Sequence, residues 1–451
     1  MLYLVRFSLS FLIAYFFGRV IYLYFCNPHE KHDLISTLHS LFLGLGFTSI
    51  FFWFYTIATN GYNTNYHVVE TCFAGILYLS LRFKSGNKLF SFHTKKSNSE
   101  KKKRTLLNYM AIILFSLIAV YSWYKCIKYP DGTYDAIAMW NFRAKFLSCG
   151  NEAWNRMYFN TFDYSHRDYP LFLPCTLARF FNYVKGFDTT IPIFFAWFFN
   201  INCFILPYLY LIKLKNKYYS ILAVSILSFS PTIFFHSCVQ YSDTPLAIFF
   251  LISLYEFIKW NMENRNLPWI GMFFACLCIW IKNEGIPLYL SYSLFIIYCL
   301  YKKEKNIILS TKSFLTILAA LLPIFISVLF VRYFAHSEND LIFGLSDRLK
   351  QIFDLERYKI IMPNIWIFIK QHFWIMFIPV YLFTGFIDKK YYKFKYLLLI
   401  IILMNLLFIL AYLISPHDLV WHVENSFPRI ASVYLPSLMF LGCLIFDYKR
   451  E

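Results

Sequence analysis

The sequence predicts an all-α, polytopic membrane protein with about 13 transmembrane helices. Of its 451 residues, 59% are hydrophobic and only 15% are charged, which is too apolar for a soluble globular domain. Stretches long enough to cross a hydrocarbon core of ~30 Å, which takes about 20 helical residues, recur along the whole chain. They are continuously apolar and lack the alternation of a transmembrane β-barrel, so we expect helices.

The first apolar stretch carries Arg6 and Arg19 and has no small-residue cleavage pattern, so we expect a retained helix rather than a removed signal peptide. A short apolar segment, 171–185, contains Pro174 and Arg179, and we expect a re-entrant or half-buried helix there. The predicted spans are residues 1–24, 36–58, 67–83, 105–124, 190–212, 219–235, 245–260, 268–281, 286–301, 313–334, 365–386, 397–414 and 430–447.

The formal net charge of +18 comes from basic residues gathered in loops. Four clusters lie at 82–104, 213–217, 302–312 and 389–395. The positive-inside rule explains them better than nucleic-acid binding does, so we expect these loops to be cytoplasmic. The remaining large loops should then emerge together on the opposite side. These loops are 125–170, 236–243, 282–285, 335–364 and 415–429.

The organisation along the chain is that of one membrane domain. We expect N-terminal transmembrane helices over 1–83, a basic cytoplasmic loop over 84–104, and a transmembrane module over 105–451 with a large external loop at 125–170. The eleven cysteines are odd in number and lie mostly within spans, which argues against a disulfide framework. We find no internal repeat, which counts against an inverted-repeat transporter.

The external loop contains a predicted amphipathic helix. Asp135 stands where an N-cap would stand, and an apolar stripe follows at helical spacing. The stripe comprises Ile137, Trp140, Ala144 and Leu147. One interpretation is a helix that only rests on the membrane, with Asp135 as its cap. The other makes Asp135 a base at the membrane surface, with Arg143 and Lys145 supplying positive charge near it.

Three further polar motifs allow either a structural or a functional interpretation. His166 and Asp168 close the external loop, either as a polar helix entry or as part of a site. Asp243 lies in a tight turn, where it can cap the next helix or serve a site. Lys282 and Glu284 stand at a span boundary, where they must be solvated, paired or bound to a ligand.

The last external loop, 417–429, contains two His, two acids, an Asn and an Arg. Arg429 stands at the entrance of the final helix, where its guanidinium can bind phosphate oxygens bidentately. His422 is a second candidate for phosphate binding. The alternative is an interface anchor formed by Arg429 together with Trp421.

Taken together, these motifs resemble the GT-C superfamily of multi-pass glycosyltransferases. The similar branch is the bacterial one that includes lipid-A aminoarabinose and galacturonic-acid transferases and protein mannosyltransferases. The resemblance covers roughly 129–429. It rests on Tyr134-Asp135-Ala136 with Trp140 and Lys145, Asp168-Tyr169-Pro170-Leu171, Asp243 with Pro245-Leu246-Ala247, Lys282-Asn283-Glu284-Gly285, and Asp418-Leu419 with Trp421-His422, Ser426 and Arg429.

The resemblance implies an inverting transfer of a sugar from a polyprenyl-phosphate carrier to an acceptor hydroxyl on the non-cytoplasmic face. Asp135 matches the acidic residue that is the usual candidate base. Displacement at the anomeric carbon needs such a carboxylate and stabilisation of the departing phosphate. The candidates for the phosphate are Lys282, His422 and Arg429. The candidates that orient sugar hydroxyls or fix those cations are Asp168, Asp243 and Glu284.

The resemblance also implies partners and a location. The expected partners are a lipid-linked sugar donor, a lipid, glycan or protein acceptor, and membrane lipids, but no nucleic acid. The expected location is the bacterial inner membrane. A divalent metal occurs in parts of the superfamily, but these motifs show no clear ligand set, and no cofactor is predicted.

The main alternative is a transporter or flippase of a lipid-linked saccharide. A transporter should carry ionisable groups near the middle of its spans. Several later spans, such as 397–414, carry none, and the charged motifs stand at the ends of spans, which favours the enzyme. A structural scaffold would leave the motifs at 282–285 and 418–429 without an explanation.

Overall fold

The computed structural model describes residues 1–25, 33–85, 106–159, 161, 165–214, 217–263, 268–304, 307–336, 344–372 and 395–448. Within these ranges all regular structure is helical, as predicted. The longer helices are α1 (Leu2–Phe25), α2 (Leu34–Ala58), α3 (Tyr66–Ser85), α4 (Leu106–Ile127), α6 (Phe172–Val184), α7 (Thr190–Lys213), α8 (Lys217–Ser228), α9 (Pro231–Cys238), α10 (Asp243–Glu263), α11 (Trp269–Ile281), α12 (Gly285–Glu304), α13 (Ile307–Ala335), α15 (Leu355–Gln371), α17 (Lys395–Leu413), α18 (Leu419–Ser432) and α19 (Leu435–Tyr448). The short ones are η2 (Ala136–Asn141), α5 (Phe142–Ser148), η3 (Glu152–Tyr158), α14 (Leu345–Arg348) and η5 (Leu349–Phe353).

The number of membrane spans is established only in part. Among the described residues, four helices, α1, α2, α4 and α7, are long and apolar enough to cross a membrane. The number rises to six if two bent pairs each count as one span: α8 with α9, bent by 68°, and α18 with α19, bent by 44°. The chain therefore contains membrane-type helices, and the count of about 13 stays a prediction.

Two predicted spans differ from the structure in shape. Continuous helices were expected over 219–235 and 430–447, but breaks at 229–230 and 433–434 divide both. In the first, Ser230 has extended backbone and Pro231 begins the new helix, because proline suits the first helical position. The span expected over 365–386 also shifts: α15 begins ten residues earlier, at Leu355, and ends at Gln371, while 373–386 lie outside the described residues.

The segment predicted to be re-entrant forms α6. Its 13 residues extend about 20 Å at 1.5 Å per residue, which is less than the ~30 Å of a hydrocarbon core. Lys185, in the left-handed conformation at φ 65°, ends the helix. Most α6 side chains are buried against the neighbouring helices, so α6 is a packed internal helix too short for a complete crossing.

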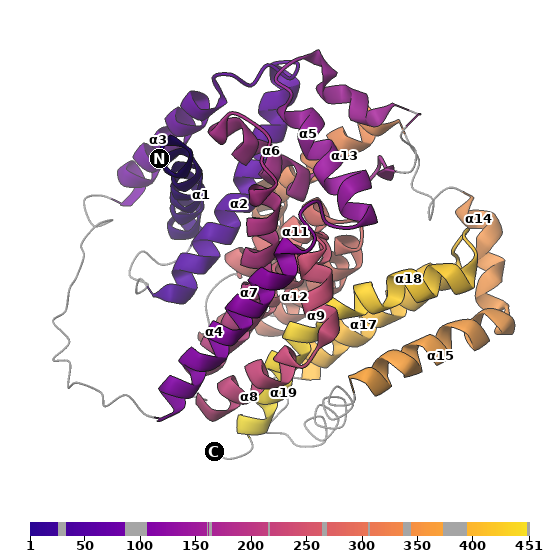
Figure 1. The fold of residues 1–451 in the computed structure, drawn as a ribbon. Coiled ribbons are helices and arrows are strands. Elements are labelled where there is room, and N and C mark those ends of the chain that lie inside the picture. The colour runs from indigo at the N-terminus through magenta and orange to yellow at the C-terminus, as the bar shows by residue number, and fades with distance from the viewer. Residues whose placement is uncertain are drawn as a thin grey trace, which may run out of the picture.

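Contacts between loops define the two ends of the helix bundle. At one end, an ion pair joins Asp33 before α2 to Lys213 at the end of α7, at 2.7 Å. At the other end, Trp154 of η3 donates a hydrogen bond to Asn60, just after α2 (3.1 Å). The turns α9–α10 and α11–α12 lie at this second end, which we call the polar end. Figure 1 shows α18 running beside α17 and reaching α9 near the centre of the molecule.

Candidate active site

Charged side chains from four parts of the chain meet at the polar end. Asp135 immediately precedes η2, Asp243 is the first residue of α10, and Arg429 lies in the second half of α18. Lys282 and Glu284 belong to the turn between α11 and α12. We call these five residues the charge cluster. The sequence predicts all five as site residues, and the fold brings them together.

The cluster is a chain of ion pairs in which Asp243 is shared. The ammonium of Lys282 lies 2.8 Å from Oδ1 of Asp243 and 2.7 Å from Oε1 of Glu284. The guanidinium of Arg429 contacts the carboxylate of Asp135 through one terminal nitrogen, and its Nε lies 3.5 Å from Oδ2 of Asp243. Asp243 therefore links the lysine half of the cluster to the arginine half.

Exposure rises from the centre of the cluster to its edge. The side chains of Lys282 and Asp243 are 1% and 4% exposed, whereas those of Glu284, Arg429 and Asp135 are 15%, 17% and 23% exposed. Burying an ion pair is favourable only if its geometry is good and its remaining polar atoms are satisfied. The Lys282–Asp243 pair therefore lies at the buried centre of the cluster, and Glu284, Arg429 and Asp135 form its partly exposed edge.

The two cations keep Asp243 ionised. Burial alone would raise the pKa of this carboxyl, but the charges of Lys282 and Arg429, with the hydrogen bond from Lys282, outweigh burial and hold the pKa at about 2. An opposite charge within a few ångströms has this effect because it stabilises the carboxylate. Asp243 is therefore a permanent anion that orients both cations and does not act as a proton donor near neutral pH.

An aromatic ring supports the arginine. The guanidinium carbon of Arg429 lies 5.1 Å from the ring centre of Tyr241, within range of a cation–π interaction. The hydroxyl of Tyr241 accepts a hydrogen bond from Thr133 Oγ1 at 2.8 Å. Thr133 lies two residues before Asp135. This hydrogen bond therefore connects Tyr241, whose ring contacts Arg429, to the segment that contains Asp135.

The end of the predicted external loop borders the lysine half. Asn283 donates a hydrogen bond of 2.8 Å to the carboxylate of Asp168, and the Tyr169 hydroxyl lies 3.5 Å from Oε1 of Glu284. The Tyr169 ring packs edge-on against Trp140, with centroids 5.9 Å apart. Asp168 and Tyr169 are thus part of the wall around the cluster.

A glutamine holds the segment before Asp135 against the turn between α9 and α10. Gln240 donates hydrogen bonds to the carbonyl oxygens of Tyr129 (2.9 Å) and Pro130 (3.0 Å). It accepts one from Asn141 Nδ2 at 2.7 Å. Gly132 allows the close approach, because a Cβ there would lie 2.6 Å from the carbonyl oxygen of Val239. We call the contacts of Gln240 and Asn141 the amide latch.

Asp135 stands at the expected N-cap position, directly before η2, but its side chain does not cap the helix. Asp135 has helical backbone angles, φ −64° and ψ −35°, and its side chain makes no cap hydrogen bond. The next residues form a π-helix, η2, before the chain returns to an α-helix in α5. π-Helical turns are rare and frequently lie at functional sites. The carboxylate of Asp135 is therefore free of a capping role and pairs with Arg429.

The apolar stripe after Asp135 packs into the protein rather than resting on a membrane surface. Trp140, Ala144 and Leu147 are 1% exposed or less, and only Ile137, at 55%, is exposed. The amphipathic pattern is real, but the buried face contacts α6 and η3, which lie over it. The prediction of an interfacial helix at this position is thus wrong for most of the stripe.

Four other predicted residues lie apart from the charge cluster. Arg143 is fully buried and donates to the backbone carbonyls of Ser165, His166 and Tyr169, so in this arrangement it fixes the loop and is not available to a ligand. His166 and Lys145 are exposed. His422 is bonded through Nδ1 to the Ser415 hydroxyl at 2.7 Å, and its ring packs on Tyr412.

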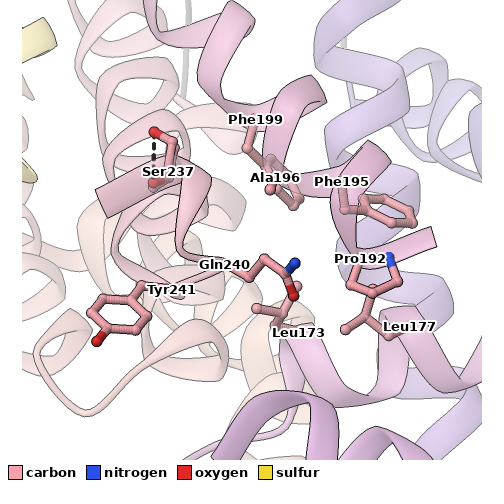
Figure 2. A pocket seen from close by; sticks show the side chains of 10 residues that line it. Leu173, Leu177, Pro192, Phe195, Ala196, Phe199, Ser237, Gln240 and Tyr241 are labelled. Carbon is pink, nitrogen blue, oxygen red and sulfur yellow. Dashed lines mark hydrogen bonds between the residues drawn. The ribbon is translucent and has the colours of Figure 1, made fainter. Parts of the chain in front are cut away.

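Two small cavities lie behind the cluster. Figure 2 shows the first, where apolar side chains of α6 and α7 lie beside Gln240. The second is lined by Asp243 and His236, and both cavities share Ser237 and Thr244. Both ring nitrogens of His236 are buried and have no hydrogen-bond partner among the described residues.

Sequence reasoning missed several residues of this site. His236 and Gln240 precede the Asp243 motif directly, and Asn141 follows Asp135 by six positions. A polar run just before a predicted helix entry is the only signal for the first two. Asn141 gives no signal, because its partner is 99 positions away. Tyr241 and Asn283 belong to motifs that the sequence singles out, although without a role of their own.

The described residues contain no group of three or more His, Cys, Asp or Glu side chains arranged to hold a metal ion. Comparison of the chain with protein-family models, with curated proteins and with solved structures finds no match.

Proposed function

We propose that the chain is an inverting glycosyltransferase with a GT-C-like fold. It moves a sugar from a polyprenyl-phosphate carrier to an acceptor hydroxyl on the non-cytoplasmic face of the membrane. The observation that carries the proposal is the contact between Asp135 and Arg429, which lie 294 positions apart, directly beside the Lys282–Asp243 pair. Displacement of a phosphate at an anomeric carbon requires a carboxylate that deprotonates the acceptor and cations that stabilise the departing phosphate, and the cluster contains both kinds of group.

The residues divide into roles by exposure and charge. Asp135 is the most exposed carboxylate of the cluster and is the proposed base that takes the proton of the acceptor hydroxyl. Arg429 and Lys282 are the proposed partners of the departing phosphate, because both offer N–H donors with full positive charge. Asp243 orients these two cations. Arg429 and Lys282 are then already positioned to stabilise the negative charge that develops on the leaving phosphate.

The proposed orientation follows from the distribution of basic residues. The polar end carries the charge cluster, whereas the basic run 213–217 begins at the end of α7, where Lys213 pairs with Asp33. Under the positive-inside rule that basic end is cytoplasmic. The cluster then faces the periplasmic or external side of a bacterial inner membrane, where lipid-linked sugars are used.

The decisive test is identification and turnover of a lipid-linked donor. The purified full chain in nanodiscs should retain a polyprenyl phosphate or its sugar conjugate, detectable by mass spectrometry of extracted lipid. Arg429→Ala should lose that lipid, whereas the control Lys359→Ala, a lysine 69% exposed on α15, should keep it. The proposal fails if neither the wild-type chain nor a screen of polyprenyl-phosphate sugars yields bound lipid or transfer.

One observation favours the transporter alternative and gives it a test. His39 of α2 and Glu256 of α10 form a buried pair at 2.8 Å, and the other ring nitrogen of His39 bonds to the Tyr210 hydroxyl at 2.7 Å. Ionisable residues within membrane-spanning helices mark ion or proton pathways in transporters. If the chain moves lipid-linked saccharide across proteoliposomes and Glu256→Gln stops it while Asp135→Asn does not, the transporter replaces the enzyme.

A further inference from the structure

The charge cluster is not electrically balanced. Among the described residues it contains three carboxylates, Asp135, Asp243 and Glu284, and two cations, Lys282 and Arg429. With all five ionised its net charge is −1. A phosphodiester ligand would add a further negative charge to a partly buried site, where like charges repel more strongly than in water.

Protonation of one carboxylate would remove this repulsion, and the surroundings differ among the three candidates. Asp243 is unsuitable because Lys282 and Arg429 hold its pKa at about 2 against the opposing effect of burial. Asp135 is the proposed base and must remain ionised to accept a proton. Glu284 remains, so the choice of Glu284 rests on the proposed function.

The contacts of Glu284 suit this role. Its Oε1 binds Lys282 at 2.7 Å, whereas its Oε2 is buried and has no hydrogen-bond partner among the described residues. A carboxylate oxygen left without a donor is costly when charged, and it can instead carry a proton. The charged and titratable groups near Glu284 come from five segments. They are Lys282, Asp243 of α10, Arg429 of α18, Tyr412 of α17, and Asp168 and Tyr169 before α6.

We propose that Glu284 competes with the ligand's phosphate for Lys282 and leaves this cation by taking up one proton. In the binding step, Lys282 exchanges Oε1 of Glu284 for a phosphate oxygen, and a proton from solvent binds the Glu284 carboxylate. The net charge of the occupied cluster stays at −1. Release of the phosphate reverses both changes, so ligand binding and proton uptake are linked.

Linkage gives the proposal a measurable signature. The probe is farnesyl methyl phosphate, a phosphodiester that keeps one negative charge throughout the range from about pH 5 to about pH 8. Isothermal titration of the full chain in detergent should show affinity falling as pH rises, by up to about tenfold per pH unit for one linked proton. Titration of the wild-type chain in buffers of different ionisation enthalpy should independently count close to one proton taken up.

Glu284→Gln removes the negative charge of this carboxylate permanently, as protonation does reversibly. This variant should bind the probe with an affinity that no longer depends on pH, and at the upper end of the range it should bind about tenfold or more tightly than the wild-type chain does. The matched control is Glu424→Gln, which removes an exposed carboxylate from α18 and should retain the wild-type pH dependence.

The possible outcomes separate the proposals. Binding without pH dependence or proton uptake in the wild-type chain would overturn the role of Glu284 and leave the proposed function intact. A pH dependence that survives Glu284→Gln but disappears in Asp135→Asn would also overturn it, because the proton would then belong to Asp135. No binding by the wild-type chain at any pH would overturn the proposed function as well. If Glu284→Gln does not fold, the proton count in Asp135→Asn decides: uptake of one proton by this variant supports the role of Glu284, and no uptake overturns it.

Discussion

Glu70 and Arg179 form a second buried ion pair, and its construction differs from that of the charge cluster. Arg179 of α6 donates to both carboxylate oxygens of Glu70 in α3, at 2.8 and 3.0 Å. The hydroxyls of Tyr66 and Tyr183 donate to the same two oxygens at 2.8 and 2.6 Å. One acid meets one cation, both carboxylate oxygens are satisfied, and neither side chain is more than 1% exposed.

The charge cluster differs from this pair in its charge balance and in its exposure. It holds three described acids against two cations, its side-chain exposure reaches 23% at Asp135, and one oxygen of Glu284 has no partner among the described residues. A charge buried in a membrane-type bundle is therefore not by itself a sign of function. Imbalance and partial access distinguish the candidate site from a structural ion pair, and the following experiments test that distinction.

The largest expected effect is that of Asp135→Asn on the rate of sugar transfer. Loss of the proposed base should lower the rate of sugar transfer by about 10²- to 10⁴-fold, while the thermal unfolding temperature changes little, because Arg429 keeps Asp243 as a counter-charge. Transfer rates and unfolding in detergent are measured on the same preparation, with Glu424→Gln as control. A stable variant with full transfer activity would show that Asp135 is not the base.

At the Glu70–Arg179 pair we expect a substitution to reduce stability. Glu70→Ala leaves the buried guanidinium of Arg179 without its counter-charge and should lower the free energy of unfolding by about 3–5 kcal/mol. The double variant Glu70→Ala/Arg179→Leu should recover much of the loss, because it removes the orphaned charge as well. If the single variant is as stable as the wild-type chain, the pair is not the structural element that its burial indicates.

Acid should weaken the fold through Asp243. Its pKa in the folded chain is about 2, below the ordinary value of 3.8, because Lys282 and Arg429 outweigh the effect of burial. The unfolded chain thus binds more protons between these values, so this stabilisation is complete above about pH 4 and is lost as pH falls towards 2. It amounts to about 2 kcal/mol. Unfolding followed from about pH 5 downwards should be less acid-sensitive in Asp243→Asn; an identical slope would contradict the assignment.

The smallest expected effect concerns the amide latch. Gln240→Ala removes hydrogen bonds to two backbone carbonyls and should lower the free energy of unfolding by only about 1 kcal/mol. Hydrogen exchange should nonetheless accelerate in 129–141, which carries Asp135, and remain unchanged in α1 and α2. If Gln240→Ala accelerates exchange in 129–141 no more than in α1 and α2, the latch does not position this segment.

The sequence predicts helix positions well where one helix runs unbroken. The span expected over 190–212 is α7, Thr190–Lys213, because continuous apolarity of that length permits only a helix. The breaks before Pro231 and Leu435 were not predicted. Hydropathy averages over a window, so it is insensitive to a local change of backbone direction within an apolar segment.

For the candidate site, the residue types were predictable but their pairing was not. Asp135, Asp243, Lys282, Glu284 and Arg429 stand out because a charge at the end of an apolar run needs a reason. Which cation meets which acid depends on contacts between distant helices, as the pair formed by Asp135 and Arg429 shows. The contacts of Arg143 were unpredictable for the same reason, since its carbonyl partners at 165–169 cannot be read from local spacing.

The positions of Arg179 and Arg429 in the chain also determine the order in which the two groups of ion pairs can form during synthesis. Arg179 leaves the ribosome 250 residues before Arg429, an interval of roughly 10–50 s at typical translation rates. The Glu70–Arg179 pair can close early and hold the first helices together. Asp135 and Asp243 remain without Arg429 until α18 has been made, so the insertion of α18 completes the site last among the segments that form it.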